Sequence, residues 1–97
     1  MPPMTEFQQK VFKVVRSIPR GKVLSYAEVS WRLDSKDSAR AVGNALNKNR
    51  DKTVPCHRVI RSDGRVGGFN GGTAKKIKLL EAEGIKIKNG RIIKREQ

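Results

Sequence analysis

Cysteine and histidine are almost absent from this sequence, and their scarcity excludes several kinds of structure. The chain has one cysteine, Cys56, and one histidine, His57, among its 97 residues. A lone cysteine forms no internal disulfide, which agrees with a reducing intracellular setting. A structural zinc site takes four ligands, mostly Cys and His, so this pair is too small for one. We therefore expect neither a disulfide nor a metal site.

Long apolar segments are also missing. The N-terminal stretch MPPMTEFQQKVFKVV is interrupted by charge and Gln from its sixth residue, unlike the apolar region of a secretory signal. No apolar run approaches the ~20 residues that cross a bilayer. The sequence therefore predicts neither a leader nor a membrane span, and no membrane is expected as a partner.

Acidic residues are also few compared with basic ones. Nine Asp and Glu accompany 22 Lys and Arg, which gives a formal net charge of +13. Such an excess of cations on a short chain favours a polyanionic partner. The alternative is a solvated basic surface without a special ligand.

The residues that are present form short, regular patterns that fit one domain over residues 1–97. In TEFQQKVFKVVRSI the apolar residues recur at three- and four-residue steps behind Thr5. This periodicity predicts an amphipathic helix over 5–18 that is capped by Thr5 and stopped by Pro19 and Gly21.

Two shorter helices are predicted next. Ser25 and Glu28 have the spacing of a capping box, which predicts a helix from there to Leu33. After the polar break DSKDS, the stretch SARAVGNALNKN predicts a third helix that begins at Ser38. Two short helices joined by a brief polar turn indicate a helix-turn-helix.

The following segment, residues 50–72, is rich in glycine and predicts loops around a short extended piece at Val59 and Ile60. The stretch TAKKIKLLEAEG then predicts a helix that ends at Gly84. Its inward face is expected to carry four apolar residues, Ala74, Ile77, Leu79 and Leu80.

The last pattern, IKIKNGRIIK, alternates apolar and basic residues on both sides of Asn89 and Gly90, a strong hairpin signal. The predicted fold class is therefore mainly α, a winged helix-turn-helix-like single domain with a small C-terminal β-hairpin. The hairpin is either a wing that touches DNA or an edge ribbon that caps the core.

The stretch TVPCHRVI places the one thiol beside the one imidazole. Adjacent residues of an extended segment point to opposite sides, so coupling of Cys56 to His57 would need a bridging water or a bend after Pro55. His57 would act as the base, and a third group usually orients the imidazole. The sequence leaves that acid open among four candidates, Asp51, Asp63, Glu81 and Glu83. The alternative is a small buried cysteine and a satisfied surface histidine.

The stretch PCHRVI resembles the active-site signature of the O6-alkylguanine-DNA alkyltransferases, and the resemblance extends from about Phe7 to Gly84. Other blocks agree in order and spacing: GKVLSYAEV, SARAVGNALNKN, GGFNGG and KKIKLLEAEG. The resemblance implies direct-reversal DNA repair, in which Cys56 takes the alkyl group from guanine O6 once and irreversibly. It implies no cofactor.

The resemblance also implies roles for particular residues. His57 would act on the thiol through a water, Glu83 would orient His57, and Asn49 would help to hold the site. Tyr26 matches the tyrosine that donates a proton to the departing guanine or crowds its 3′ phosphate. The guanine pocket would be formed by Pro55, Val59, Gly67, Phe69, Asn70 and Gly71.

Arg40 matches the arginine that fills the gap left in the duplex by a flipped base. Flipping is needed because the O6 substituent is out of reach of a protein sulfur inside a duplex. The helix around Arg40 is slim enough to enter a minor groove, although core packing is an alternative for Ala41 and Ala45. Gly43 in mid-helix also favours a close approach, because it costs about 1 kcal/mol relative to Ala. The DNA-binding residues expected are Tyr26, Ser25, Ala39, Arg40, Ala41, Gly43, Asn44 and Lys48.

Phosphate contacts are expected from Lys22, Ser25, Lys48, Arg50, Arg65, Lys75 and Lys76. No further base-reading pattern appears, so we expect lesion search by shape and flipping. The expected partner is double-stranded DNA that bears O6-alkylguanine, bound by a monomer, with other repair proteins as additional partners. The expected location is the cytoplasm, in association with the nucleoid, or a eukaryotic nucleus.

The chain departs from the family pattern in size. Full-length members carry an N-terminal domain, which we expect to be absent here. The size resembles the alkyltransferase-like proteins, which bind alkylated guanine and recruit other repair but have Trp or Ala in place of Cys56. Phe69 and Asn70 also replace the Tyr and Ser of many members. The alternatives to transfer are thus a non-catalytic lesion sensor and a winged-helix DNA binder with an inert Cys56.

Overall fold

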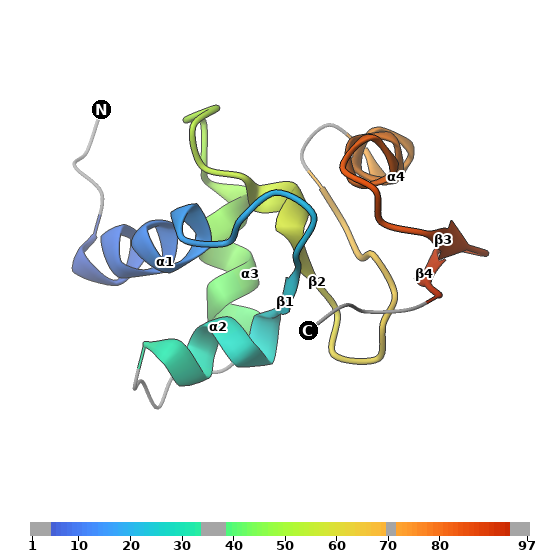
Figure 1. Cartoon of the computed structure of the whole chain (residues 1–97). Helices are drawn as coiled ribbons and strands as arrows, with labels where there is room; N and C mark the ends of the chain where they lie inside the picture. The colour runs from blue at the N-terminus through green and yellow to red at the C-terminus, as the bar shows by residue number, and fades with distance from the viewer. Residues whose placement is uncertain (1–4, 34–38, 70–71, 94–97) are drawn as a thin grey trace.

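The structure is a computed structural model, and it describes residues 5–33, 39–69 and 72–93. Its regular elements are, in chain order, α1 (Glu6–Arg16), β1 (Leu24–Ser25), α2 (Tyr26–Arg32), α3 (Ala39–Asn47), a 3₁₀ turn (Cys56–Arg58), β2 (Val59–Ile60), α4 (Thr73–Ala82), β3 (Ile87–Lys88) and β4 (Arg91–Ile92). Figure 1 shows α1, α2 and α3 on one side, β1 and β2 in the middle, and α4 with the β3–β4 hairpin on the other side.

The first two helices begin where the sequence predicts. The Thr5 hydroxyl accepts a hydrogen bond from the Gln8 N–H, and the Gln8 side chain accepts one from the Thr5 N–H. Ser25 and Glu28 form the same reciprocal pair at α2, at 3.0 and 2.9 Å. Both capping boxes satisfy N–H groups that a helix start leaves free. The predicted start of the third helix, Ser38, lies outside the described residues.

Two small sheets join the elements. The β1 and β2 strands pair in parallel with Leu24 opposite Val59, which brings the start of α2 beside the cysteine segment. The sequence predicts the extended Val59–Ile60 piece, but not this partner. The β3 and β4 strands form the predicted hairpin, in which Asn89 and Gly90 have φ angles of 55° and 74°. A glycine and an asparagine suit such left-handed angles.

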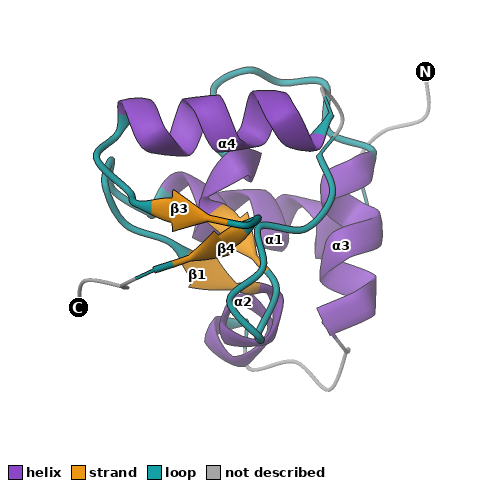
Figure 2. Ribbon diagram, turned by 90° about the vertical axis from the view of Figure 1, so that its right-hand side faces the viewer, coloured by secondary structure: helices purple, strands orange, loops and turns teal. Residues whose placement is uncertain are grey.

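The buried side chains form two adjacent clusters. The first lies among α1, α2, α3 and the cysteine segment, and includes Val11, Val29, Val42 and Val59, all 0% exposed. The second joins Val23, Ile60, Val66 and Leu80 beneath α4 and the hairpin. Figure 2 shows α4 above the β3–β4 hairpin.

The inward face of α4 corrects one prediction. Leu80 is fully buried and Ile77 and Leu79 are half-buried, as predicted, but Ala74 is exposed. Lys76, which precedes Leu80 by one helical turn, is 0% exposed and takes an inward position instead. None of the described helices has the length and apolar character that crossing a membrane requires.

The fold class is confirmed as mainly helical with small strands. The hairpin packs as an edge ribbon that caps the core, one of its two predicted roles. Ile87 and Ile92 contact the second cluster, and Arg91 forms a β-bridge with Arg65. This packing leaves the other face of the hairpin free to take part in binding.

Candidate active site

Cys56 begins the 3₁₀ turn, where Arg58 N–H donates to the Pro55 carbonyl at 2.9 Å. The premise of an extended segment at Cys56 and His57 is therefore wrong, and the chain bends after Pro55. Buried Val54 and Val59 hold the two ends of this turn in the first cluster. The turn is fixed because apolar anchors flank it on both sides.

Among the described residues, the thiol has one hydrogen-bond partner, Asn49, which the resemblance places in the site. Asn49 Nδ2 donates to Cys56 Sγ at 3.0 Å and to the Asp51 carbonyl at 3.0 Å. The Asp51 N–H in turn donates to Asn49 Oδ1 at 2.8 Å. These backbone contacts hold the Asn49 amide in the orientation that presents its N–H to sulfur. Such a donor favours the thiolate over the thiol.

Burial is the larger influence on the thiol itself. It raises the pKa of Cys56, against the opposing effects of the Asn49 hydrogen bond and the Lys76 charge. The free protein therefore holds a mostly protonated thiol near neutral pH, so a base is needed to generate the nucleophile.

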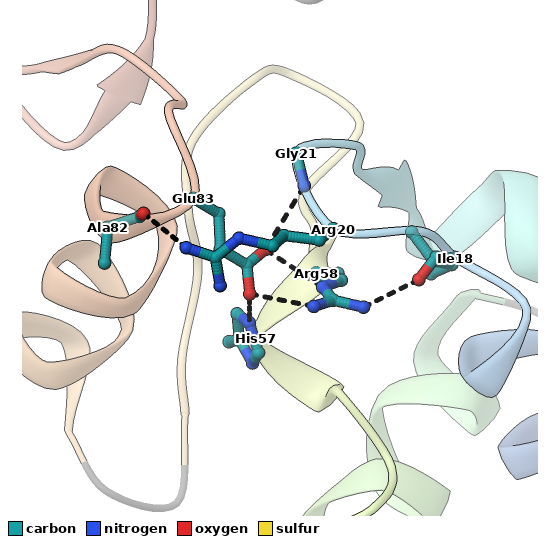
Figure 3. A network of polar contacts seen from close by, with 7 residues as sticks. All are labelled: Ile18, Arg20, Gly21, His57, Arg58, Ala82 and Glu83. Atoms are coloured by element: carbon teal, nitrogen blue, oxygen red, sulfur yellow. Dashed lines mark hydrogen bonds and ion pairs between the residues drawn. The ribbon is translucent and has the colours of Figure 1, made fainter.

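Glu83 is the acid that contacts His57. The residues alone left four candidates for this acid, and the resemblance implied Glu83. Its Oε2 lies 2.8 Å from His57 Nε2, and both of its oxygens accept from the Arg58 guanidinium at 2.9 Å (Figure 3). Burial raises the pKa of the Glu83 carboxyl, but the hydrogen bonds and charges of Arg58 and His57 outweigh it and lower the pKa to about 2. The other three candidates make no contact with His57 among the described residues: Asp51 lines the same hollow but pairs with Arg16, Asp63 pairs with Arg61, and Glu81 is exposed.

The ionised carboxylate determines which nitrogen of His57 carries a proton. A carboxylate only accepts hydrogen bonds, so a neutral imidazole places its proton on Nε2 and leaves Nδ1 as an acceptor. Within the described part of the chain, the imidazole makes no hydrogen bond to the thiol. A proton passing from Cys56 to Nδ1 would therefore need a bridging water; the resemblance implies such a water, and it stays a prediction.

Arg58 joins three separate segments at this point (Figure 3). Its Nη1 donates to the Ile18 carbonyl at the end of α1 at 2.8 Å, while its other nitrogens bind Glu83 at the end of α4. Arg20 adds a bond to the Ala82 carbonyl at 2.8 Å. The joining role of Arg58 has no local sequence signal, because Glu83 lies 25 residues away.

Lys76 corrects a second prediction. It is fully buried, and its Nζ donates to the carbonyls of Val59 at 2.7 Å and Gly68 at 3.2 Å, so it makes no phosphate contact. The ammonium lies 5.9 Å from the centroid of the Tyr26 ring. Burial lowers the pKa of Lys76 to about 8, against the effect of Cys56. Its position one turn before Leu80 was the signal that it faces inward.

A hollow of about 600 Å³ opens over these groups. Tyr26, Asn49, Cys56 and His57 line it together with Pro55 and Phe69, and cations stand around it: Arg16, Arg50, Lys52, Arg58 and Lys75. Burial raises the pKa of the Tyr26 hydroxyl, with Cys56 adding to the effect. The hydroxyl therefore stays protonated and able to donate at neutral pH.

The predicted pocket residues divide into three groups. Pro55 and Phe69 line the hollow, whereas Val59 is buried behind it with its carbonyl bound by Lys76. Gly67, like Val59, does not line it: it lines a second hollow beside the hairpin, and a Cβ there would lie 3.2 Å from Arg61 Cγ and 3.7 Å from the Tyr26 hydroxyl. Asn70 and Gly71 lie outside the described residues.

The predicted DNA-binding residues are placed on α3 and at the start of α2. On α3, Arg40, Asn44 and Lys48 at its end are exposed, while Ala39, Ala41 and Gly43 are half-buried. Ala45 is 4% exposed, so core packing explains it. Lys22 is half-buried, and Arg50, Arg65 and Lys75 are exposed.

Ser25 differs from the expectation, whereas the close approach of Gly43 to DNA stays a prediction. Ser25 is 4% exposed and its hydroxyl caps α2, which leaves it no free surface for the phosphate contact predicted for it. A Cβ on Gly43 would lie 3.9 Å from Tyr26 Cε1, an ordinary contact distance. No close approach within the described chain therefore requires a glycine there.

Comparisons with known proteins agree with this geometry. Residues 6–85 match the family described as 6-O-methylguanine DNA methyltransferase, DNA binding domain. The methylated-DNA–protein-cysteine methyltransferase of Methanothermobacter thermautotrophicus is 49% identical over 84 residues, which are 86% of this chain and 47% of that protein. The chain thus spans about half the length of the curated relatives it matches.

Solved structures give the same result. The structure of Mycobacterium tuberculosis OGT in complex with DNA matches with a TM-score of 0.79 and 43% identity, over 84% of this chain and 51% of that chain. The structure of S. pombe Atl1 in complex with damaged DNA containing O6-carboxymethylguanine matches with a TM-score of 0.78 and 35% identity, over 90% and 83%. The resemblance carried by PCHRVI is confirmed, and the chain belongs to the 6-O-methylguanine DNA methyltransferase family, of which it carries the DNA-binding domain.

Proposed function

We propose that this chain repairs DNA by direct reversal, taking the alkyl group of O6-alkylguanine onto Cys56. The observation that carries the proposal is the hydrogen bond from Asn49 to Cys56 Sγ, in the hollow that His57 and Tyr26 also line. An inert buried cysteine does not need an oriented amide donor at its sulfur. The relatives named as methylated-DNA–protein-cysteine methyltransferases support the same reaction.

The hollow suits a single extruded nucleotide. Its volume of about 600 Å³ lies within the range of small-ligand pockets. Reaction requires the base to leave the duplex, which costs a few kcal/mol in lost stacking. Arg40, exposed on α3, can fill the vacated position with its planar guanidinium. The cations around the hollow, among them Arg50 and Lys75, can hold the phosphates of the extruded nucleotide.

The reaction proceeds by displacement. A water passes the Cys56 proton to His57 Nδ1, and Glu83 stabilises the imidazolium that forms. The thiolate attacks the alkyl carbon, so that the S–C bond forms while the C–O6 bond breaks and its electron pair goes to guanine. The Tyr26 hydroxyl supplies the proton that guanine takes up. The thioether is stable, so each molecule reacts once.

A second candidate function is lesion binding without transfer. It is favoured by the match to the structure of S. pombe Atl1 in complex with damaged DNA containing O6-carboxymethylguanine. A sensor of this kind would flip and hold alkylguanine and recruit other repair proteins. The proposals differ in whether Cys56 forms a bond.

Intact mass measurement separates them. Wild type and Cys56→Ala are each incubated with a duplex that carries one O6-methylguanine, and with the matched duplex that carries guanine. We expect wild type to gain the mass of one methyl group, mapped to Cys56, only with the damaged duplex, and Cys56→Ala to gain none while it still binds. An unchanged wild-type mass, with equal lesion-preferring binding by both proteins, would support the sensor.

A further inference from the structure

A second basic surface lies beside the candidate active site, and its backbone is firmly held. The Val66 N–H donates to the Gly90 carbonyl at 3.0 Å, and the Ile92 N–H donates to the Gly64 carbonyl at 2.9 Å. Arg65 and Arg91 complete a β-bridge at the same place. The hairpin and the loop after β2 thus act as one small sheet, although they are distant in sequence.

The two faces of this sheet differ in chemistry. Ile87 and Ile92 face the second core cluster. Lys88 and Arg91, the cross-strand neighbours at the end of the hairpin, are exposed. The alternation of apolar and basic residues thus fixes the hairpin to the core and keeps its cations at the surface.

These cations face an open hollow of about 960 Å³, which we call the hairpin groove. Its charged lining residues are Arg61, Arg65, Lys88 and Arg91, and none of the described residues that line it is acidic. Asp63 is the nearby acid; it lies 3.3 Å from Arg61 and 3.9 Å from Arg65, and both arginines remain more than half exposed. The groove therefore keeps a surplus of positive charge.

The wall of the groove toward the active site is glycine backbone. Gly67 and Gly68 line the hairpin groove, and Gly68 also lines the hollow over Cys56. Because glycine has no side chain, an extended polyanion can lie close to the chain here. A single DNA strand carries a negative charge about every 3.4 Å along the helix axis, so a strand that lies along the shared Gly68 wall would present successive phosphates to both hollows.

We propose that the hairpin groove binds the phosphate backbone of the DNA strand that flanks the flipped nucleotide. Lys88 and Arg91 then extend the DNA contact from α3 and the active site onto the C-terminal hairpin. The inference rests on the proposed repair function, because it takes the nucleotide over Cys56 as the fixed end of the bound strand. Its ligand is DNA backbone phosphate, read without regard to base sequence.

The test is the salt dependence of DNA binding by the double variant Lys88→Gln/Arg91→Gln. Both side chains are exposed and the substitutions keep their backbone pairing, so the fold should persist, which circular dichroism melting would verify. Affinity for a duplex with one O6-methylguanine is measured by fluorescence anisotropy over a salt series. We expect the slope of log K against log salt to shrink by about 1 for each lost cation, about 2 in all.

Lys13→Gln/Lys78→Gln is the matched control. It removes the same charge from two exposed lysines of α1 and α4 that line neither hollow. We expect its slope to stay within about half a unit of the wild-type slope, because non-contacting charges act only through screened potentials. Equal slopes for the two double variants would overturn the inference.

The two proposals fail in distinguishable ways. If wild type gains methyl mass but the hairpin variant keeps the wild-type slope, the repair function stands and the hairpin groove is not a DNA contact. If wild type neither binds the damaged duplex nor gains mass, both are wrong.

Discussion

At the scale of single residues, Glu83 links stability to chemistry. Its carboxylate satisfies the Arg58 guanidinium and orients His57, and its side chain is only 6% exposed. Because removal of one partner leaves the other charge buried, such a pair is costly to break. The same contact that positions the base therefore helps to hold α4 against the cysteine turn.

We expect the free energy of unfolding of Glu83→Gln to depend less on pH in the acid range than that of wild type. The pKa falls from the ordinary 4.5 to about 2 on folding, so this stabilisation is present above pH 4.5 and is lost as pH drops toward 2. The shift corresponds to roughly 3 kcal/mol. Urea denaturation from pH 7 to pH 2 should show a steep loss for wild type and a flatter, lower curve for the variant.

Glu81→Gln is the control for that measurement, because Glu81 is an exposed residue of the same helix. It should follow the wild-type curve. Identical acid limbs for wild type and Glu83→Gln would contradict the role of the carboxylate. Methyl transfer should also be slower in Glu83→Gln and unchanged in Glu81→Gln, since only the former residue touches His57.

At the scale of elements, the start of α2 connects the fold to DNA binding. Ser25 ends β1, caps α2 and precedes Tyr26, which lines the active-site hollow. We expect Ser25→Ala to lower the free energy of unfolding by about 1 kcal/mol, the usual loss for an N-cap. Thermal unfolding would measure it, with Thr5→Ala at the α1 cap as a variant of similar expected loss.

The same pair of variants decides the predicted DNA role of Ser25. If its hydroxyl serves the cap alone, Ser25→Ala and Thr5→Ala should bind a duplex with equal affinity at temperatures where both are folded. A selective loss of affinity in Ser25→Ala would instead restore the phosphate contact that the sequence predicts. The comparison works because both hydroxyls make the same kind of capping bond.

At the scale of the whole molecule, the two core clusters are tied together at their border. Parallel β1 and β2 contribute Leu24 and Val59 to the first cluster and Ile60 to the second. Arg58 adds polar bonds from one end of α1 to the end of α4. Because backbone pairing and polar bonds cross the same border, we expect the clusters to unfold together.

Leu80→Ala and Val11→Ala test this cooperativity. Both side chains are 0% exposed, one in each cluster. Leu80→Ala should cost about 2–5 kcal/mol and Val11→Ala somewhat less, because it removes fewer methyl groups. Each should shift one shared transition in circular dichroism and in amide exchange. A second, earlier transition confined to the hairpin in Leu80→Ala would show two independent units.

Features that depend on contacts between residues close in sequence were predicted correctly, whereas features that depend on distant residues were not visible in the sequence. The capping boxes at Thr5 and Ser25 and the turn at Asn89 lie within four residues of their partners, so their patterns are visible in the sequence. Lys76 was mistaken for a surface cation, because charge normally outweighs helical position in such a prediction. Two backbone carbonyls, from Val59 and Gly68, make its burial tolerable.

Local patterns and composition were enough to predict the starts of α1 and α2, the hairpin, the basic character of the chain and the placement of a thiol beside an imidazole at Cys56 and His57. These depend on neighbouring residues and on composition. Without the resemblance, the residues alone left four acids open; folding places the Glu83 carboxylate against His57 and brings the hairpin cations into one groove with the loop after β2. The physical reason is distance along the chain: Glu83 lies 26 residues from His57, and burial in a common core brings them together.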